Sequence, residues 1–149
     1  MLDDLLKPEF IKINVECSDW KSALKQGTNI LLQHKCVEER YYDEIIRSFN
    51  DIGPYMVVAP GIVLSHARPE AGVRKLSMSL ITLKNPINFG SKYNDPVKFI
   101  VTLAATDSES HLKALAQLME LFMDSEDLRK IMDATNKEEV LSIIKNYSK

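Results

Sequence analysis

The stretch Ala59–Glu70 reads A-P-G-I-V-L-S-H-A-R-P-E and contains the strongest structural signal in the chain. Pro60-Gly61 opens it with a turn and Pro69 closes it, and an unbroken apolar run, Gly61–Leu64, lies between them. A short apolar run bounded by turn signals is typical of a buried strand. We therefore predict a strand that delivers the side chain of His66 at its end.

His66 and Arg68 are the first candidates for a functional site. Residues two apart in a strand point to the same side, so both face one space if the extended backbone continues through Ala67. An Arg guanidinium can hold a phosphate bidentately, and an imidazole can act as its nucleophile. The alternative interpretation is a structural histidine at a strand end beside an ordinary surface charge.

Composition bounds the class of protein. The chain has 149 residues, 45% hydrophobic and 27% charged, which fits one soluble globular domain. A net charge of -2 and a pI near 5.9 argue against nucleic-acid binding. No apolar run approaches the roughly 20 residues that cross a bilayer. The start, Met1–Asp4, is acidic where a signal peptide would be basic. We expect a cytoplasmic protein.

The remaining segments alternate between strand-like and helix-like patterns, with no repeat or long linker. The expected helix N-caps are Ser18, Ser108, Ser125 and Asn136. Glu139 is the expected capping-box partner of Asn136. Gly27 weakens the middle of its helix by about 1 kcal/mol relative to Ala. Residues 85–90 suggest a turn with a short edge segment. We expect strands at 10–15, 55–58, 61–66, 76–83 and 97–105, and helices at 19–34, 37–49, 126–134 and after Ser108 and Asn136.

A second histidine, His111, follows the strand expected at 97–105. If Ser108 caps the next helix, His111 occupies its third position. His66 and His111 then both lie where a strand gives way to a loop or helix, which is where ligands bind in open α/β sheets. A helix N-terminus also receives phosphate readily and favours a neutral imidazole.

These positions indicate one site with divided roles. His66 is the candidate nucleophile and His111 its orienting or charge-stabilising partner, while Arg68 and the helix end at Ser108 hold the phosphate. For His111, a plain helix residue making a local cap contact remains open. His34, near the end of the first long helix, is expected to be structural or merely exposed.

The sequence lacks the motifs that would indicate a metal site, a serine hydrolase or a nucleotide-binding site. Two imidazoles without a third ligand at suitable spacing do not indicate zinc, and Cys17 and Cys36 form no CxxC pair, so we expect both thiols to be reduced and at least half-buried. The motif G-x-S-x-G is absent, as are the Walker A loop and G-x-G-x-x-G. We expect no metal and no other cofactor.

Two motifs carry a family resemblance. The stretch Ala59–Glu70 resembles the active-site segment of enzyme IIA components of the bacterial sugar phosphotransferase system, in the mannitol/fructose structural class. Thr106–Leu118, T-D-S-E-S-H-L-K-A-L-A-Q-L, resembles the second-histidine segment of that family. The form A-P-G…H-A-R-P, with G-P-Y upstream, is most similar to the ascorbate-specific branch. The resemblance covers nearly the whole chain and implies one EIIA type-2 domain, residues 1–149, with a mixed β-sheet flanked by helices on both sides.

The resemblance also implies an activity and partners. His66 would accept a phosphoryl group from the phosphocarrier HPr and pass it to a cysteine of enzyme IIB, with His111 as the active-site partner. Enzyme IIB would then phosphorylate a sugar, L-ascorbate by the branch resemblance, that arrives through the membrane enzyme IIC. No nucleic acid and no direct membrane insertion are implied. The oligomeric state stays open, although an amphipathic helix face could serve a homodimer.

The assisting arginine is the point of departure from the family pattern. In the mannitol branch an Arg precedes the active strand, but here the matching position falls near Phe49, with Arg47 two residues earlier. Arg68 is our candidate replacement. Two other functions share the fold: a regulatory EIIA-like domain whose phosphorylation state controls a partner protein, and a binding domain that takes no phosphate.

Overall fold

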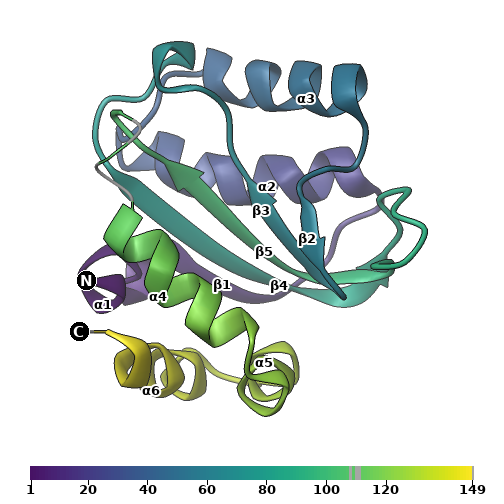
Figure 1. Ribbon diagram of the computed structural model, residues 1–149, viewed down its shortest axis with the longest axis vertical. Helices are drawn as coiled ribbons and strands as arrows, with labels where there is room; N and C mark the ends of the chain where they lie inside the picture. Colours follow the sequence, from purple (N-terminus) through teal and green to yellow (C-terminus); the bar gives the residue numbers. More distant parts are fainter. Residues whose placement is uncertain (108, 110–111, 149) are drawn as a thin grey trace.

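A five-stranded mixed sheet forms the centre of the structure, a computed structural model that describes residues 1–107, 109 and 112–148 (Figure 1). Helices cover both faces, so the α/β fold implied by the resemblance is confirmed. The strands stand in the order β1-β4-β5-β3-β2. Their bounds are β1 Ile11–Val15, β2 Val57–Ala59, β3 Ile62–Ser65, β4 Ser77–Ile87 and β5 Val97–Ala104.

Strand direction decides which ends meet. β3 runs parallel to β5, with Ile62 opposite Phe99 and Ser65 opposite Thr102. β4 is antiparallel to β5, β1 is parallel to β4, and β2 is antiparallel to β3. The carboxyl ends of β3 and β5 therefore lie side by side at one edge of the sheet, where His66 follows β3.

The helices form two layers. Two helices cover one face of the sheet, and the other helices lie against the opposite face (Figure 1). No helix within the described residues is long and apolar enough to span a membrane. The first layer is α2 (Trp20–Gln33) and α3 (Arg40–Ile52), and the second is α1 (Leu2–Leu5), α4 (Leu112–Phe122), α5 (Ser125–Met132) and α6 (Lys137–Tyr147).

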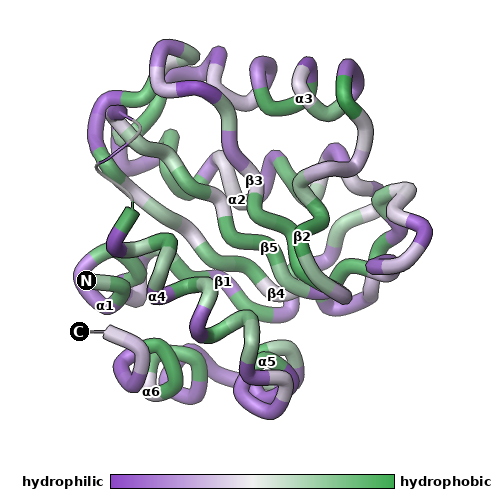
Figure 2. The backbone as a smooth tube through the Cα atoms, in the orientation of Figure 1, coloured by the Kyte–Doolittle hydropathy of each residue, from purple (hydrophilic) through white to green (hydrophobic). Residues whose placement is uncertain are grey.

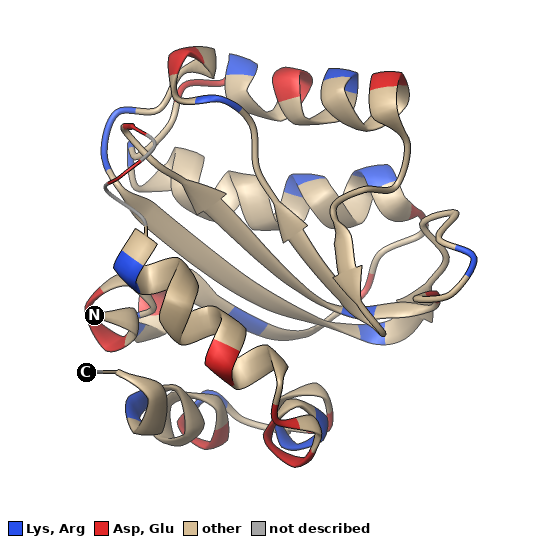
Figure 3. Ribbon diagram, in the orientation of Figure 1, with Lys and Arg blue, Asp and Glu red and all other residues tan. Residues whose placement is uncertain are grey.

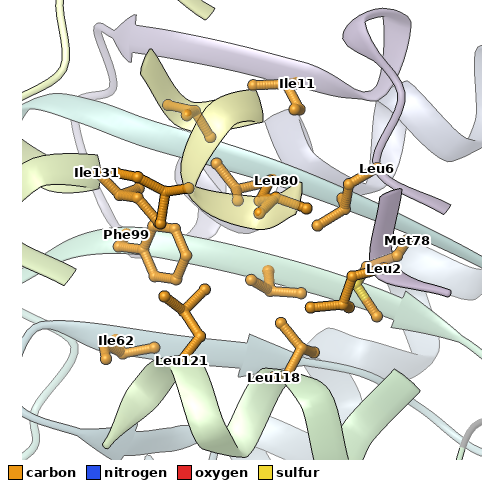
Figure 4. Close-up of a cluster of buried hydrophobic side chains, with 14 of the residues drawn as sticks. Leu2, Leu6, Ile11, Ile62, Met78, Leu80, Phe99, Leu118, Leu121 and Ile131 are labelled. Carbon is orange, nitrogen blue, oxygen red and sulfur yellow. The ribbon is translucent and has the colours of Figure 1, made fainter. Parts of the chain in front are cut away.

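Because helices cover both faces of the sheet, its central strands are mostly apolar along their length. Every residue of β3 and nearly all of β5 is buried, so these strands read as apolar runs and not as alternating patterns. Figure 2 shows this hydrophobic character along the central strands, and Figure 3 places the charged residues mainly on helices and loops. Between the sheet and the second layer, Phe99, Leu118, Leu121 and Ile131 pack in one cluster (Figure 4).

Two expected N-caps are wrong by one residue. α2 is capped by Asp19 and not Ser18, because the Asp19 carboxylate accepts from the Ser22 N–H at 2.8 Å and the Ser22 hydroxyl accepts from the Asp19 N–H. α5 is capped by Asp124 and not Ser125, since its carboxylate accepts from the Asp127 N–H at 3.0 Å. The Asn136 cap is confirmed.

In that confirmed cap, the Asn136 side chain accepts from the Glu139 N–H at 3.0 Å and donates to the Glu139 carboxylate at 3.2 Å. The first contact satisfies a backbone N–H at the start of α6. The second joins two side chains, so the expected capping box, in which the Glu139 carboxylate would accept from the Asn136 backbone N–H, is not formed.

Tertiary contacts explain why the start of α3 and the end of β4 differ from the predicted boundaries. α3 begins at Arg40 and not at Val37, because Val37 bridges to Val73 and the Glu38 N–H donates to the Gly72 carbonyl at 2.8 Å, which holds this segment extended. β4 continues to Ile87 through the expected turn at 85–90, since Ile87 pairs with Val97. The short helix α1 carries no long periodic pattern and was not predicted.

Close packing of α2 against the sheet explains why a glycine stands at position 27. A Cβ atom at this position would overlap with the Thr102 Oγ1 atom, and the Gly27 carbonyl accepts a hydrogen bond from the Ser79 hydroxyl at 2.7 Å. The Thr102 side chain is buried and its hydroxyl forms no hydrogen bond to the described residues. The absence of a side chain lets α2 approach β5 closely, which outweighs the lower helix propensity of glycine.

We predict that Gly27→Ala lowers the free energy of unfolding by about 1–3 kcal/mol, because overpacking exceeds the gain of about 1 kcal/mol in helix propensity. Thr102→Ala removes the overlapping atom, so adding it to Gly27→Ala should recover stability relative to the sum of the two single changes. Urea unfolding of the four proteins measures this coupling. A Gly27→Ala protein more stable than wild type would refute the close approach.

Candidate active site

The site lies at the end of β3. The strand places Ser65 in the interior, and the chain then leaves the sheet at His66, whose side chain is half-buried. The backbone is extended again at Arg68, before the short 3-10 turn Pro69–Ala71. The burial of the apolar run thus fixes where the imidazole emerges, as the sequence predicted.

A cavity of about 390 Å³ opens around this point. Its walls come from the end of α3, the segment after it, the segment after β3 and the end of β5. His66 and Arg68 both contribute, so the two side chains share one space, as the alternation of an extended chain predicts. The lining residues are Ser48, Ile52, Tyr55, His66, Ala67, Arg68, Pro69, Leu103, Ala105 and Asp107.

The imidazole of His66 has a defined orientation. Its Nδ1 atom lies 3.0 Å from the Leu64 carbonyl oxygen. A carbonyl oxygen can only accept, so this contact requires the proton on Nδ1, and in the neutral imidazole the lone pair is then on Nε2. The ring of Tyr55 stands edge-on to the imidazole, with centroids 5.9 Å apart. The geometry therefore leaves Nε2 as the nitrogen without a hydrogen bond to the described residues.

Arg68 links this cavity to a second one of about 410 Å³. Arg68 lines both and is exposed, and it forms no ion pair within the described part of the chain. Arg47 lines only the second cavity, where it pairs with Glu44 at 3.2 Å. Of the two arginines weighed from the sequence, Arg68 is the one beside His66.

Tyr41 lies next to the cavity, and the sequence did not single it out. It belongs to the apolar face of α3, and its buried side chain ends in a hydroxyl between the segment after β3 and the end of β5. This hydroxyl accepts from the Ala67 N–H at 3.0 Å and donates to the Leu103 carbonyl at 2.7 Å. The residue spacing marks a core position but carries no sign of these contacts.

Two predicted residues, Ser108 and His111, lie outside the described residues, so the Ser108 cap and the role of His111 stay predictions. His34 is the C-cap of α2, where its Nδ1 lies 2.8 Å from the Ile30 carbonyl, in agreement with a structural role. Cys17 is half-buried and Cys36 buried, and both are free thiols. Among the described residues, no group of three His, Cys, Asp or Glu side chains could hold a metal ion.

Known proteins resemble the chain over nearly its full length. The sequence profile described as "Phosphoenolpyruvate-dependent sugar phosphotransferase system, EIIA 2" matches residues 4–147. The ascorbate-specific EIIA component of Escherichia coli K12 is 38% identical over 143 residues, which cover 95% of this chain and 93% of that protein.

Solved structures agree in fold. The solution structure of the cryptic mannitol-specific enzyme IIA of Escherichia coli is 32% identical, with a TM-score of 0.88 over 97% of this chain and 98% of that one. An enzyme IIA for mannitol from the same organism, solved in complex with phosphorylated enzyme IIB, is 19% identical. Its TM-score is 0.84 over 95% of this chain and 99% of that one, which shows a shared fold.

Proposed function

Because this chain belongs to the EIIA 2 family of the phosphoenolpyruvate-dependent sugar phosphotransferase system, and is a phosphotransferase component of that system, we propose that His66 carries its phosphoryl group. The contact between Nδ1 and the Leu64 carbonyl supports this assignment, since it leaves Nε2 available in a cavity that Arg68 shares. The proposed extent of the EIIA domain, residues 1–149, is supported by the family match over residues 4–147.

In the proposed reaction, the Nε2 lone pair of His66 attacks the phosphorus atom of phosphorylated HPr. A bond forms between Nε2 and phosphorus, and the bond to the donor breaks with its electron pair returning to HPr. The thiolate sulfur of a cysteine in enzyme IIB then attacks the same phosphorus, and the electron pair of the breaking bond returns to Nε2. Phosphoryl transfer of this kind depends on positioning and charge stabilisation.

We assign the other roles in the reaction from the charge and the position of each residue. The Arg68 guanidinium suits the phosphoryl oxygens, and it is not engaged by a carboxylate of the described residues. We assign the helix end at Ser108 to the same task and His111 to orienting the phosphoryl group or stabilising its charge. The Leu64 carbonyl holds the proton on Nδ1 through both transfers.

We propose phosphorylated HPr as donor and enzyme IIB as acceptor, with enzyme IIC reached only through enzyme IIB, and we place this exchange in the cytoplasm. The complex formed by a mannitol enzyme IIA of the same fold supports the choice of enzyme IIB. L-Ascorbate is the proposed sugar, because the 38% identical relative is ascorbate-specific whereas the mannitol-specific protein is 32% identical.

The rim of the cavity offers a docking surface for these partners. Ile52 at the end of α3 is 68% exposed and Tyr55 is 40% exposed, and both line the cavity that holds His66. Exposed apolar side chains that surround a reactive group gain energy when a partner covers them. We therefore assign Ile52 and Tyr55 to the contact with HPr.

Incubation with phosphoenolpyruvate, enzyme I and HPr should add one acid-labile phosphate to the wild type, measured by intact mass. His66→Ala should remain unlabelled. His111→Ala should take up phosphate more slowly but to the same mass, and NMR of the product should show phosphorus on Nε2. An adduct that persists in His66→Ala, or is lost only in His111→Ala, would contradict the assignment.

Arg68→Ala should slow phosphorylation of His66 by about a hundred- to a thousandfold, the scale of losing one charge-stabilising donor. Arg47→Ala is the matched control, because Arg47 is an exposed arginine near the site that does not line the cavity around His66. It should change the rate less than threefold. Quench-flow mass spectrometry gives both rates, and a larger loss in Arg47→Ala would transfer the role to Arg47.

Ile52→Ser should raise the KM for phosphorylated HPr about tenfold and leave kcat nearly unchanged, since interface truncations of this kind cost about 1–2 kcal/mol. Met123→Ser is the control: Met123 is 86% exposed but lines neither cavity near His66. Steady-state kinetics over a range of HPr concentrations separates the two constants. Equal effects of both substitutions would show that Ile52 does not contact HPr.

A further inference from the structure

The hydroxyl of Tyr41 makes two close hydrogen bonds in the interior, to residues that line the cavity. Its oxygen accepts from the Ala67 N–H at 3.0 Å, and its proton goes to the Leu103 carbonyl, 2.7 Å away. The Ala67 carbonyl lies farther from the hydroxyl, at 3.4 Å. Ala67 follows His66 directly, and Ala67 and Leu103 both line the cavity, whereas Tyr41 does not.

The pairing of β3 with β5 shows what the hydroxyl replaces. Ser65 lies opposite Thr102. If the same register continued for two more residues, Ala67 would lie opposite Ala104. The Gly61 carbonyl accepts from the Phe99 N–H at 3.1 Å, so the peptide groups of Gly61, and of alternate residues after it, point at β5. If this alternation continued beyond Ser65, the next hydrogen bond of the ladder would run directly from the Ala67 N–H to the Leu103 carbonyl.

The oxygen of Tyr41 is inserted into this next rung of the ladder. The Ala67 N–H reaches the Leu103 carbonyl through the hydroxyl, so the two strand ends are linked but held farther apart than a direct hydrogen bond would hold them. Burial raises the pKa of Tyr41 to about 12, so the hydroxyl keeps its proton and both contacts at neutral pH.

We propose that Tyr41 is the positioning residue for His66: its hydroxyl fixes the Ala67 peptide against the end of β5, and so sets the direction of Nε2 for phosphoryl transfer. The inference rests on the proposed role of His66. The imidazole is then held from two sides, by the Leu64 carbonyl at Nδ1 and by the anchored peptide that follows the residue. A ring held in this way requires less reorientation before the transfer.

Tyr41→Phe tests the proposal because it removes one oxygen and keeps the ring that packs in the core. Tyr42→Phe is the matched control: the neighbouring tyrosine of α3 donates its hydroxyl to the Lys21 carbonyl at 3.2 Å, away from the cavity. Each variant loses one tyrosine hydroxyl from the same helix. Melting temperatures establish that both are folded.

For Tyr41→Phe we expect kcat for phosphorylation of His66 to fall at least tenfold with an unchanged KM for phosphorylated HPr, because Ile52 and Tyr55 remain in place. Nitrogen NMR should show a mixture of His66 tautomers in place of one with the proton on Nδ1. Tyr42→Phe should match wild type in kcat and tautomer. Equal changes in both variants, or a normal kcat and a single tautomer in Tyr41→Phe, would overturn the proposal.

Hydrogen exchange of the wild type gives a test that does not depend on a variant. The Ala67 amide should exchange at least tenfold more slowly than the Arg68 amide, and equal rates would overturn the anchoring role. The two proposals fail separately. A wild type that takes no phosphate refutes the role of His66, whereas a phosphorylated wild type with indistinguishable tyrosine variants refutes only the role of Tyr41.

Discussion

The parallel ladder between β3 and β5 is the constraint on which the site depends. Four residue pairs, from Ile62 opposite Phe99 to Ser65 opposite Thr102, bring together the ends of two strands that are far apart in the sequence. Parallel neighbours end at the same edge, and the chain must leave the sheet there. His66 is the first residue beyond the ladder, so its position is set by backbone hydrogen bonds more than by its own side-chain contacts.

Burial on both faces makes this placement rigid. β3 is covered by the α2–α3 layer on one side and by α4–α6 on the other, and each of its residues is buried. Shifting β3 by one residue would exchange the side chains that face the two cores. The same packing that stabilises the fold therefore holds the imidazole at one depth, half-buried and open to a partner.

The sequence predicted this much because the relevant signals are local. Pro60-Gly61, the apolar run and Pro69 are contiguous, and so they identified β3 and the emergence of His66. The Asn136 cap was visible for the same reason. Tertiary contacts decided what the sequence did not predict: Val37 is held extended by Val73, and β4 continues because Ile87 finds Val97.

Tyr41 shows the same limit at the site. Its spacing in α3 marks a buried position, which is correct, but the partners of its hydroxyl come from two other segments. Arg68 was predictable because it lies two residues from His66 in the same extended segment. The sequence thus predicted that Arg68 lies beside His66, whereas the contacts of the buried hydroxyl became apparent only with the strand register.

A phosphohistidine relay places opposing demands on one imidazole. The ring must be reached by a donor and then by an acceptor, so it cannot be enclosed, yet its nucleophilic nitrogen must point in one direction each time. In this structure the Leu64 carbonyl contacts Nδ1, and the buried Tyr41 hydroxyl ties the Ala67 peptide to the end of β5. Both groups belong to the packed interior, so no partner protein is needed to order them. Ile52 and Tyr55 line the same cavity, where we propose that they contact HPr while Arg68 holds the phosphoryl group.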